Sequence, residues 1–506
     1  MIRPVTRGRE IAVVFVALGL VAIAALWPVL GETGFYNDDY SYAQGSVFAP
    51  SFWDAVRVHD YLSFRPLQML YWPLAFRGLG TGYGTHQALL IGFAVLESAL
   101  VFAVARRFGV APIHAAVVAI LVLLSPAADA TRMWPAMSAN VLAVCAWLGG
   151  LLVALAGLER EGWRGRALHA GALTLYLGSI LLYEIAATLI LASGAAYVWL
   201  KGRSGLPRWA ADVGLAVLAL ALFTRRTFYD PLPLSELPAH ARLVAREAAN
   251  RFVDGFWAPS DPSFAVVAAA CVAAVGLVAI GWRAGLRGHV ALCLVAAVAS
   301  AVALVMLVPS ADLSPGRPGQ HNRGNLAAAI GFAALAYALI VLMVELAGRG
   351  RRGTTAVAVG LGIVVAIGSA VQLRRDADAW ANARAAQERV LDAVGRPPAG
   401  STVFTVRGPV TSAPDVPVFA APWDLRGALA LRHSDTTLRA YPVLPGSRLR
   451  CGRSGVEMSN SNDTFERQAA RYADAVFVDV AGRRRLEPAG ARACRQAALL
   501  TAPAPR

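Results

Sequence analysis

Eleven apolar segments recur along the chain, and they constrain its fold more than any other feature of the sequence. A transmembrane helix needs about 20 mostly apolar residues, because each residue rises only about 1.5 Å through a hydrocarbon core of about 30 Å. The chain of 506 residues is 57% hydrophobic and 16% charged, too apolar for an ordinary soluble enzyme of this length. The pattern predicts a mainly α, polytopic membrane protein of about 11 transmembrane helices, at 11–30, 85–105, 111–129, 138–157, 168–182, 184–200, 209–223, 264–282, 289–308, 325–347 and 354–373.

The charges of the connections predict the orientation of these helices. Cytoplasmic loops are enriched in Lys and Arg, and every second connection of this chain is short and basic. An odd number of spans then gives a protein of the plasma (inner) membrane with its N-terminus in the cytoplasm and its C-terminus outside. The predicted cytoplasmic connections are Arg106-Arg107, Glu159–Arg166, Lys201–Arg208, Arg283–Arg287 and Arg349–Arg352.

Two parts of this topology have an alternative interpretation. The N-terminal region, with Arg3, Arg7 and Arg9 before residues 11–30, has the layout of a signal peptide. Its apolar run is long for that purpose and no small-x-small cleavage site follows, so we interpret it as a retained helix. Residues 168–200 form either one long helix or two helices that meet near Tyr183-Glu184. Two are favoured, because one helix would place the later basic connections outside.

The net charge of +15 does not by itself indicate a nucleic-acid partner, because many of the basic residues lie in the short cytoplasmic connections. Two outward connections, at 224–263 and 309–324, are nevertheless basic, and the second contains His321 and Arg323. An anionic ligand would explain basic residues on this side. The alternative is that long loops cross the membrane regardless of their charge.

The sequence changes character after the last apolar segment. Trp380, Ala383 and Val390 recur at helical spacing, so residues 374–398 are predicted to be an amphipathic connecting helix and a linker. We therefore divide the chain into a transmembrane domain at 1–373, this connection, and an extracytoplasmic α/β domain at 399–506 that caps the membrane domain or binds an acceptor. Its predicted strands are Thr402–Val406, Pro417–Ala420, Leu438–Val443 and Ala475–Val480, and its predicted helices are Trp423–Arg432 and Thr464–Tyr472.

The five cysteines fall into two groups. Cys145, Cys271 and Cys293 lie inside apolar segments, where thiols pack as small apolar groups. Cys451 and Cys494 lie in the polar C-terminal region, and they can form a disulfide if that region is exported. No spacing of Cys and His resembles a zinc site.

Two adjacent carboxylates, Asp38 and Asp39, follow the first helix within the first outward loop, residues 32–84. They are flanked by Phe35, Tyr36 and Tyr40, aromatic residues of the kind that lie at a membrane interface. Two close carboxylates repel, which raises the proton affinity of one of them and suits it to act as a general base near neutral pH. The same loop contains a predicted short helix at Phe52–Val58.

Other ionisable groups are predicted on the same side of the membrane. Glu184 lies at the outward ends of two apolar segments, where such a residue needs a polar partner or a function. Arg65 from the first loop, with His321 and Arg323 from a distant loop, supplies cations. Carboxylates and cations at one interface suit transfer of a group from an anionic lipid donor, since the carboxylate takes the acceptor's proton and the cations neutralise the leaving phosphate.

These residues resemble a known family. The acidic pair, then Phe64-Arg65-Pro66-Leu67, then Gly80 and His86 before the second helix, is similar to the GT-C superfamily of integral-membrane glycosyltransferases, and most similar to its protein O-mannosyltransferase-like branch. Leu181–Ala186 and His321-Asn322-Arg323 resemble later motifs of that branch.

The resemblance covers about residues 30–350 and implies a GT-C architecture and an inverting transfer from a polyprenyl-phosphate sugar. It implies that Asp38 is the base, with Asp39 and Glu184 also in the catalytic group. It implies that Arg65, His321 and Arg323 bind the lipid phosphate, and that His86 and Tyr40 bind substrate. Relatives in the superfamily use a divalent ion, so Mg²⁺ or Mn²⁺ is a possible cofactor.

We therefore expect a membrane glycosyltransferase that modifies a glycan, lipid or protein of the cell envelope on the extracytoplasmic face, among membrane lipids and without nucleic acid. A transporter or flippase of lipid-linked intermediates is the first alternative. Transporters more often carry buried charges at the midplane and internal repeats, which this sequence lacks. A non-catalytic envelope assembly protein that uses its C-terminal domain for binding is the second. The sequence does not identify the sugar, the prenyl chain length or the acceptor.

Overall fold

The fold was analysed in a computed structural model that describes residues 8–27, 29–223, 232–254, 263–308, 319–348, 353–412, 415–459, 468–486 and 490–501. The chain forms two compact units, and neither is continuous in sequence. The first comprises residues 1–31, 61–68 and 84–377, and the second comprises 32–60, 69–83 and 378–506. Most of the first loop therefore belongs to the same unit as the C-terminal region. The predicted division instead assigned the whole loop to the transmembrane domain at 1–373.

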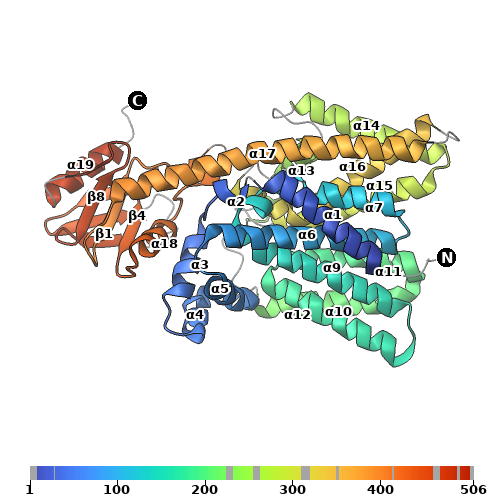
Figure 1. Ribbon diagram of the computed structural model, residues 1–506, viewed down its shortest axis with the longest axis horizontal. Helices are drawn as coiled ribbons and strands as arrows, with labels where there is room; N and C mark the ends of the chain where they lie inside the picture. The colour runs from blue at the N-terminus through green and yellow to red at the C-terminus, as the bar shows by residue number, and fades with distance from the viewer. Residues whose placement is uncertain are drawn as a thin grey trace. The chain divides into compact units, whose positions relative to one another are not determined.

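The first unit is helical, and each of the eleven predicted spans coincides with one of its helices (Figure 1). Eight helical stretches of the described chain are long and apolar enough to cross a membrane, among them a stretch that contains both α11 and α12. The mainly α membrane fold is thus confirmed. The helices are α1 (Gly8–Leu26), α6 (Tyr83–Arg107), α7 (Pro112–Leu123), α9 (Ser138–Leu158), α10 (Gly162–Leu182), α11 (Ala186–Lys201), α12 (Leu206–Phe223), α14 (Phe264–Arg283), α15 (Arg287–Leu304), α16 (Leu326–Ala347) and α17 (Thr354–Val394).

Residues 168–200 form two helices, as predicted. Tyr183 has an extended backbone with φ −158° and ψ 113°, which ends α10. The chain then folds back, so that the hydroxyl oxygens of Tyr176 on α10 and Tyr197 on α11 lie 3.3 Å apart. A second reversal follows at Gly202, whose φ of 57° suits glycine, and the Tyr197 hydroxyl donates to Asp212 on α12 at 2.6 Å.

Two segments differ from the predicted topology. The predicted span at 111–129 is too long, because α7 ends at Leu123 and gives way to the short turns η2 (Pro126–Ala128), α8 (Ala130–Met133) and η3 (Pro135–Met137). The connection at 224–263 contains a helix, α13 (Leu237–Asp254), which the prediction missed because it is amphipathic rather than apolar. The last predicted span and the predicted connecting helix form one continuous helix, α17, of 41 residues.

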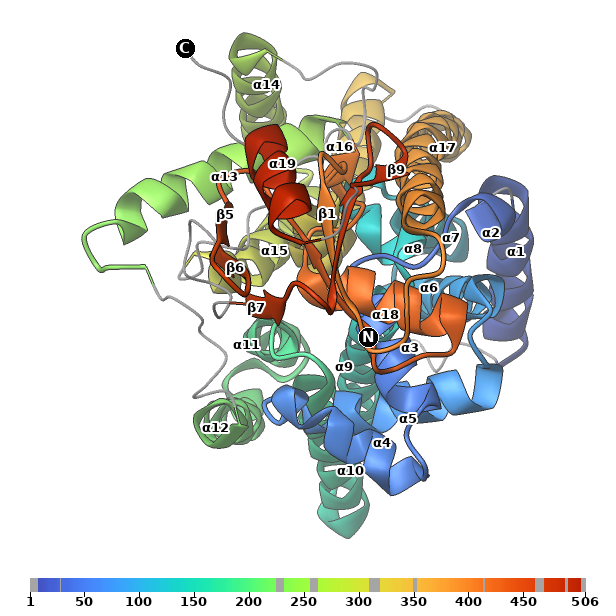
Figure 2. The same ribbon diagram turned by 90° about the vertical axis from the view of Figure 1, so that its left-hand side faces the viewer.

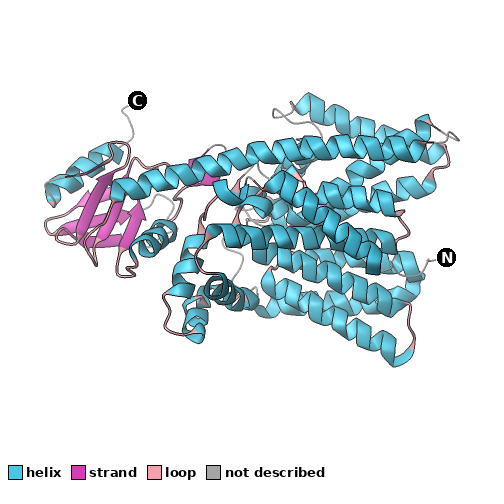
Figure 3. Ribbon diagram, viewed as in Figure 1, coloured by secondary structure: helices cyan, strands magenta, loops and turns pink. Residues whose placement is uncertain are grey.

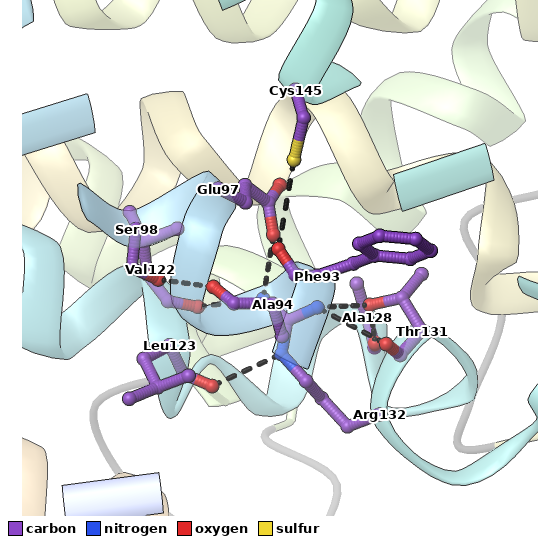
Figure 4. Close-up of polar contacts among 10 residues, drawn as sticks. All are labelled: Phe93, Ala94, Glu97, Ser98, Val122, Leu123, Ala128, Thr131, Arg132 and Cys145. Carbon is purple, nitrogen blue, oxygen red and sulfur yellow. Dashed lines mark hydrogen bonds and ion pairs between the residues drawn. The ribbon is translucent and has the colours of Figure 1, made fainter. Parts of the chain in front are cut away.

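A buried ion pair holds the end of α7 in the first unit (Figure 4). Arg132 donates to Glu97 on α6 at 3.0 Å, and both side chains are at most 3% exposed. The same guanidinium donates to the carbonyls of Val122 at 3.1 Å and Leu123 at 3.0 Å, in the last turn of α7, where carbonyls lack the N–H of a following helical turn. Because unpaired polar groups are costly at membrane depth, this arginine lets α7 end inside the protein.

The second unit contains every strand of the described chain (Figure 3). A four-stranded sheet has the order β4-β1-β8-β9, in which β4, β1 and β8 are parallel and β9 is antiparallel. A three-stranded antiparallel sheet has the order β5-β6-β7, and β2 pairs with β3. The bounds are β1 (Thr402–Val406), β2 (Thr411–Ser412), β3 (Val416–Pro417), β4 (Arg439–Pro442), β5 (Arg448–Cys451), β6 (Gly455–Ser459), β7 (Gln468–Arg471), β8 (Ala475–Asp479) and β9 (Arg484–Arg485).

The small α/β region is confirmed, with one correction. Three predicted strands lie at β1, β4 and β8, the strand predicted at Pro417–Ala420 is only the short β3, and the predicted helix at Trp423–Arg432 is α18 (Pro422–His433). The helix predicted at Thr464–Tyr472 is wrong where it is described, because Gln468–Arg471 is strand β7 and pairs with β6. Residues 464–467 lie outside the described chain. Pairing between strands overrode the local helical propensity.

Cys451 and Cys494 form a disulfide with their Cα atoms 5.9 Å apart, which confirms the predicted pairing. Cys451 ends β5 and Cys494 lies in α19 (Ala491–Thr501), so the bond joins the three-stranded sheet to the last helix. The remaining short elements are α2 (Val29–Glu32), α3 (Asp38–Val47), α4 (Phe52–Val58), η1 (Asp60–Leu62), α5 (Pro66–Leu79), η4 (Gly202–Gly205), η5 (Val305–Leu307) and η6 (Gln320–Asn325). Helix α4 has the predicted bounds.

Candidate active site

The acidic pair lies at the start of α3 in the second unit, and its two carboxylates have different surroundings. Asp39 is fully buried, and its Oδ2 accepts a hydrogen bond from the backbone N–H of Tyr36 at 2.9 Å. A carboxylate in the first turn of a helix that reaches back to a preceding N–H holds the chain at the helix entry. Asp39 therefore fixes the turn that presents Asp38.

Asp38 is partly exposed and begins the helix. Its Oδ1 accepts a hydrogen bond at 3.1 Å from the indole Nε1 of Trp423, a residue 385 positions later in the first turn of α18. The residue before Asp38 has an unusual backbone: Asn37 has φ 43° and ψ −122°, in a region that residues with a side chain rarely adopt. Such strain persists only where surrounding contacts impose it.

The aromatic residues beside the acidic pair pack against the C-terminal part of α17. The Tyr36 hydroxyl donates to the carbonyl of Trp380 at 2.6 Å, and the two rings lie edge to face at 4.7 Å. The Tyr40 hydroxyl donates to Gln387 at 3.1 Å. Burial raises the pKa of both tyrosines, so both hydroxyls stay protonated as donors. Tyr40 was predicted to bind substrate, and its hydroxyl is used in a hydrogen bond within the protein, to Gln387.

A third carboxylate, which the sequence did not indicate, faces the same turn. Asp424 follows Trp423 in α18 and is fully buried. In the orientation that satisfies both groups, the Asn37 amide nitrogen donates to the two Asp424 oxygens at 3.2 Å each. Burial raises the pKa of Asp424 well above its usual range, and the nearby charge of Asp38 raises it further.

The first unit contains a separate cluster around Arg65. This residue makes a bidentate ion pair with Glu184, through Nε to Oε2 at 2.6 Å and Nη2 to Oε1 at 2.5 Å. Its guanidinium also lies over the rings of Phe64 at 4.9 Å and Tyr183 at 4.7 Å. Glu184, which was predicted to need a polar partner or a function, thus has Arg65 as a polar partner. This geometry suits Glu184 to orient a cation.

Helix interruptions bring these side chains together. Tyr183 and Glu184 lie in the break between α10 and α11, where the Gln68 side chain donates to the carbonyl of Leu182 at 2.7 Å and to Asn140 at 3.3 Å. Irregular backbone within a membrane region is tolerated where protein groups or a polar cavity satisfy it. The break thus places an ionisable pair on a supported turn.

Two further interruptions meet in the same unit. Asn322 in η6 donates to buried Asp129 and accepts from the backbone N–H of Ala130 at 3.2 Å. Asn325 donates to the carbonyl of Ala127 at 2.8 Å. These contacts fix η6 against the turns after α7.

Arg323 of η6 lies over the ring of Trp134, with 5.6 Å from its Cζ to the ring centroid. The charges of Arg65 and Arg323 both act on the Tyr183 side chain. Within the described residues Arg323 makes no ion pair with a carboxylate.

The two predicted histidines lie in the first unit. His86 is buried in the first turn of α6, and His321 is half-buried in η6. The described parts of the chain contain no group of three or more His, Cys, Asp or Glu side chains arranged to hold a metal ion.

The structure thus groups the predicted residues into two sets, each within one unit. Asp38, Asp39 and Tyr40 lie together in the second unit, whereas Arg65, Glu184 and Arg323 belong to the first, where the charges of all three act on Tyr183. Sequence reasoning missed Trp423, Asp424 and Trp134, because no local pattern distinguishes them from packing residues.

Comparison with known proteins adds little to this description. No family model matches the chain, and no match was found among curated proteins. Solved structures that match the chain include ArnT from Cupriavidus metallidurans in the apo state, at 14% identity, with 86% of this chain and 85% of that chain covered and a TM-score of 0.40. The same protein bound to undecaprenyl phosphate matches at 14% identity, over 84% and 89% of the two chains, with a TM-score of 0.35.

The oligosaccharyltransferase of Archaeoglobus fulgidus, tethered to an acceptor peptide with the NVT sequon, matches at 14% identity and a TM-score of 0.43. The match covers 85% of this chain and 63% of that one. Likenesses at this level establish neither the family nor the reaction of this chain.

Proposed function

We propose that this chain is a GT-C-type membrane glycosyltransferase that moves a sugar from a polyprenyl-phosphate donor to a glycan, lipid or protein acceptor of the cell envelope. The observation that carries the proposal is the unequal acidic pair. Asp39 is buried and holds the backbone of the turn, whereas Asp38 is partly exposed at the helix start. A supported, accessible carboxylate is what a general base requires.

In the proposed reaction Asp38 removes the proton from an acceptor hydroxyl or amine as that atom attacks the anomeric carbon of the sugar. The bond between this carbon and the phosphate oxygen breaks, and its electron pair stays on the phosphate. The products are the glycosylated acceptor and a polyprenyl phosphate, and the configuration at the anomeric carbon is inverted. The transfer needs no nucleotide, oxidant or reductant.

The arginine cluster of the first unit supplies the charge that the leaving phosphate requires. Guanidinium groups bind phosphate oxygens through paired N–H donors, and they neutralise the charge that develops as the bond breaks. We assign Arg65, Arg323 and His321 to the lipid phosphate. Glu184 then acts by orienting Arg65 through the bidentate pair. His86 and Tyr40 are assigned supporting roles at the substrates.

The disulfide and the predicted topology support a location for the reaction. Disulfides persist in oxidising compartments and are rare in the cytosol. The Cys451–Cys494 bond supports an extracytoplasmic second unit, and the acidic turn belongs to that unit. The proposed chemistry therefore takes place on the outer face of the plasma (inner) membrane.

The test is consumption of a lipid-linked sugar by the full chain in nanodiscs. We expect wild-type protein to release polyprenyl phosphate from at least one member of a panel of polyprenyl-phosphate sugars when envelope acceptors are supplied. A flippase would instead move a fluorescent donor across a vesicle bilayer without breaking the sugar–phosphate bond. Transbilayer movement without release for every donor would contradict the proposal.

A further inference from the structure

Helix α18 of the C-terminal region lies directly on the helix that begins with the acidic pair (Figure 2). The two helices are close enough that a Cβ added at Gly427 would lie 2.6 Å from the carbonyl oxygen of Tyr40. Only glycine allows this approach without a shift of the backbone. The position of α18 on α3 is therefore fixed by backbone contact as well as by side chains.

The first turn of α18 contacts the acidic turn through two consecutive residues. Trp423 donates its indole N–H to Asp38 at 3.1 Å, and Asp424 accepts from the Asn37 amide at 3.2 Å. Asn37, directly before Asp38, has the strained backbone from which α3 begins. Asp424 thus stabilises the turn, and Trp423 holds the carboxylate that the turn presents.

From this geometry we infer that Trp423 is a positioning residue for the proposed base. Its N–H donates to Oδ1 of Asp38 and so fixes the orientation of the carboxylate that takes the acceptor's proton. The inference rests on the proposed function, because it assigns Trp423 to the same base. It gives the C-terminal region a direct part in the reaction.

Another role for Trp423 is anchoring at the membrane interface, since the residue is 41% exposed and tryptophans are enriched there. The two roles differ in what the indole N–H does. An anchor needs the apolar ring, whereas a positioning residue needs the N–H. Trp423→Phe keeps an aromatic ring and removes only the donor, so it separates the two roles.

Several ionisable groups near Asp38 can affect how the reaction rate depends on pH. Asp39 and Tyr40 lie on its own helix, Asp424 lies on α18, and Glu388 on α17 acts on Tyr40. Removing a donor from a carboxylate raises the proton affinity of that carboxylate. Loss of the indole N–H should therefore move the acidic limb of the rate profile to higher pH.

The experiment measures polyprenyl phosphate release against pH for the full chain in nanodiscs. We expect Trp423→Phe to lower the maximal rate about 10-fold, the effect of one hydrogen bond to a charged group, and to shift the acidic limb upward by up to about one pH unit. Trp53→Phe is the matched control, because Trp53 is 62% exposed on α4 and lies outside the proposed machinery. It should keep the wild-type rate and profile.

The result that overturns the inference is a Trp423→Phe profile that matches that of Trp53→Phe while Asp38→Asn is inactive. Release by Asp38→Asn at the wild-type rate would instead overturn the proposed function. If Trp423→Phe does not purify as a folded protein, Trp423→His, which keeps a ring N–H, replaces it. A His variant with more than half of the wild-type rate supports the inference, and one with the activity of Asp38→Asn overturns it.

Discussion

At the scale of single residues, the structure assigns different tasks to neighbouring or paired acids. Asp39 is buried and satisfies a backbone N–H, whereas Asp38 is partly exposed. Glu184 is 9% exposed and is engaged by Arg65 through two hydrogen bonds. Residue type alone does not distinguish these three acids, but their hydrogen bonds do. Asp38 is the proposed base, whereas Asp39 orients the backbone of the turn and Glu184 orients Arg65.

The pair of Arg65 and Glu184 gives the first prediction. If Glu184 acts only by orienting Arg65, the effects of removing each residue will not add. We expect Arg65→Ala to lower kcat/KM for the lipid donor about 100-fold, Glu184→Gln to lower it about 10-fold, and the double variant to match Arg65→Ala, since a charged hydrogen bond contributes about 1.5 to 3 kcal/mol. The measurement is a double-mutant cycle on steady-state kinetics. Additive losses would give Glu184 a separate catalytic role.

His59 in the first loop gives a prediction about pH. It is fully buried beside Ser46, whose Oγ lies 3.0 Å from Nε2, and burial lowers its pKa to about 4. Because the folded-state pKa lies below the ordinary value near 6.5, this histidine stabilises the fold fully above pH 6.5. That contribution, at most about 3 kcal/mol, is lost as pH falls through 4.

We expect amide hydrogen exchange in α3 and α4 to quicken when the pH is lowered from 7 to 4.5, after correction for the intrinsic rate. His59→Gln should show a smaller change over the same range. An equal change in the variant and the wild type would assign the pH dependence to other groups.

At the scale of elements, the sequence predicted which segments are helical better than how they end. All eleven apolar segments coincide with helices, because the apolar character that drives them into a membrane is local. The early end of α7 was not predictable, since it depends on Arg132, which satisfies the carbonyls of Val122 and Leu123 from a later turn. Strand β7 was missed for a similar reason, because its partner β6 outweighs its own propensity.

The ion pair of Glu97 and Arg132 gives the element-scale prediction. Removing one partner of a buried pair leaves an uncompensated charge, which costs about 3 to 5 kcal/mol. We expect Arg132→Met to prevent recovery of folded protein. Glu97→Gln should be milder, because the amide oxygen still accepts from Arg132.

The readout is thermal unfolding and the monodisperse yield in detergent. Glu10→Gln serves as the control, since Glu10 pairs with Arg106 at 3.4 Å and is 38% exposed. If Arg132→Met unfolds at the same temperature as Glu10→Gln, the ion pair does not have the proposed structural role.

At the scale of the whole molecule, the alternation of charge predicts which side each region faces. Eleven spans predict that the second unit faces outside and that the connection near residue 352 lies in the cytoplasm. We expect a membrane-impermeant thiol reagent to label engineered cysteines near residues 240 and 430 in intact cells. A cysteine near residue 352 should react only after permeabilisation, and labelling of that site in intact cells would contradict the topology.

The candidate site could be predicted from the sequence only in part. Asp38, Arg65, Glu184 and Arg323 stood out as charged residues beside apolar segments, where ionisable groups are costly. Trp423 and Asp424 did not, because they lie in an ordinary amphipathic helix and meet the acidic turn only through the tertiary fold. Contacts between residues nearly 400 positions apart leave no pattern in a single sequence.

The most direct test of the proposed function compares Asp38→Asn with Asp60→Asn, an exposed aspartate of the same loop. Both variants remove one charge and keep a similar shape, but only the first removes the proposed base. We predict that Asp38→Asn loses at least about 100-fold in polyprenyl phosphate release, the usual contribution of a general base, and unfolds at the wild-type temperature. Asp60→Asn should retain wild-type release. Equal release by the two variants with every donor would contradict the proposed function.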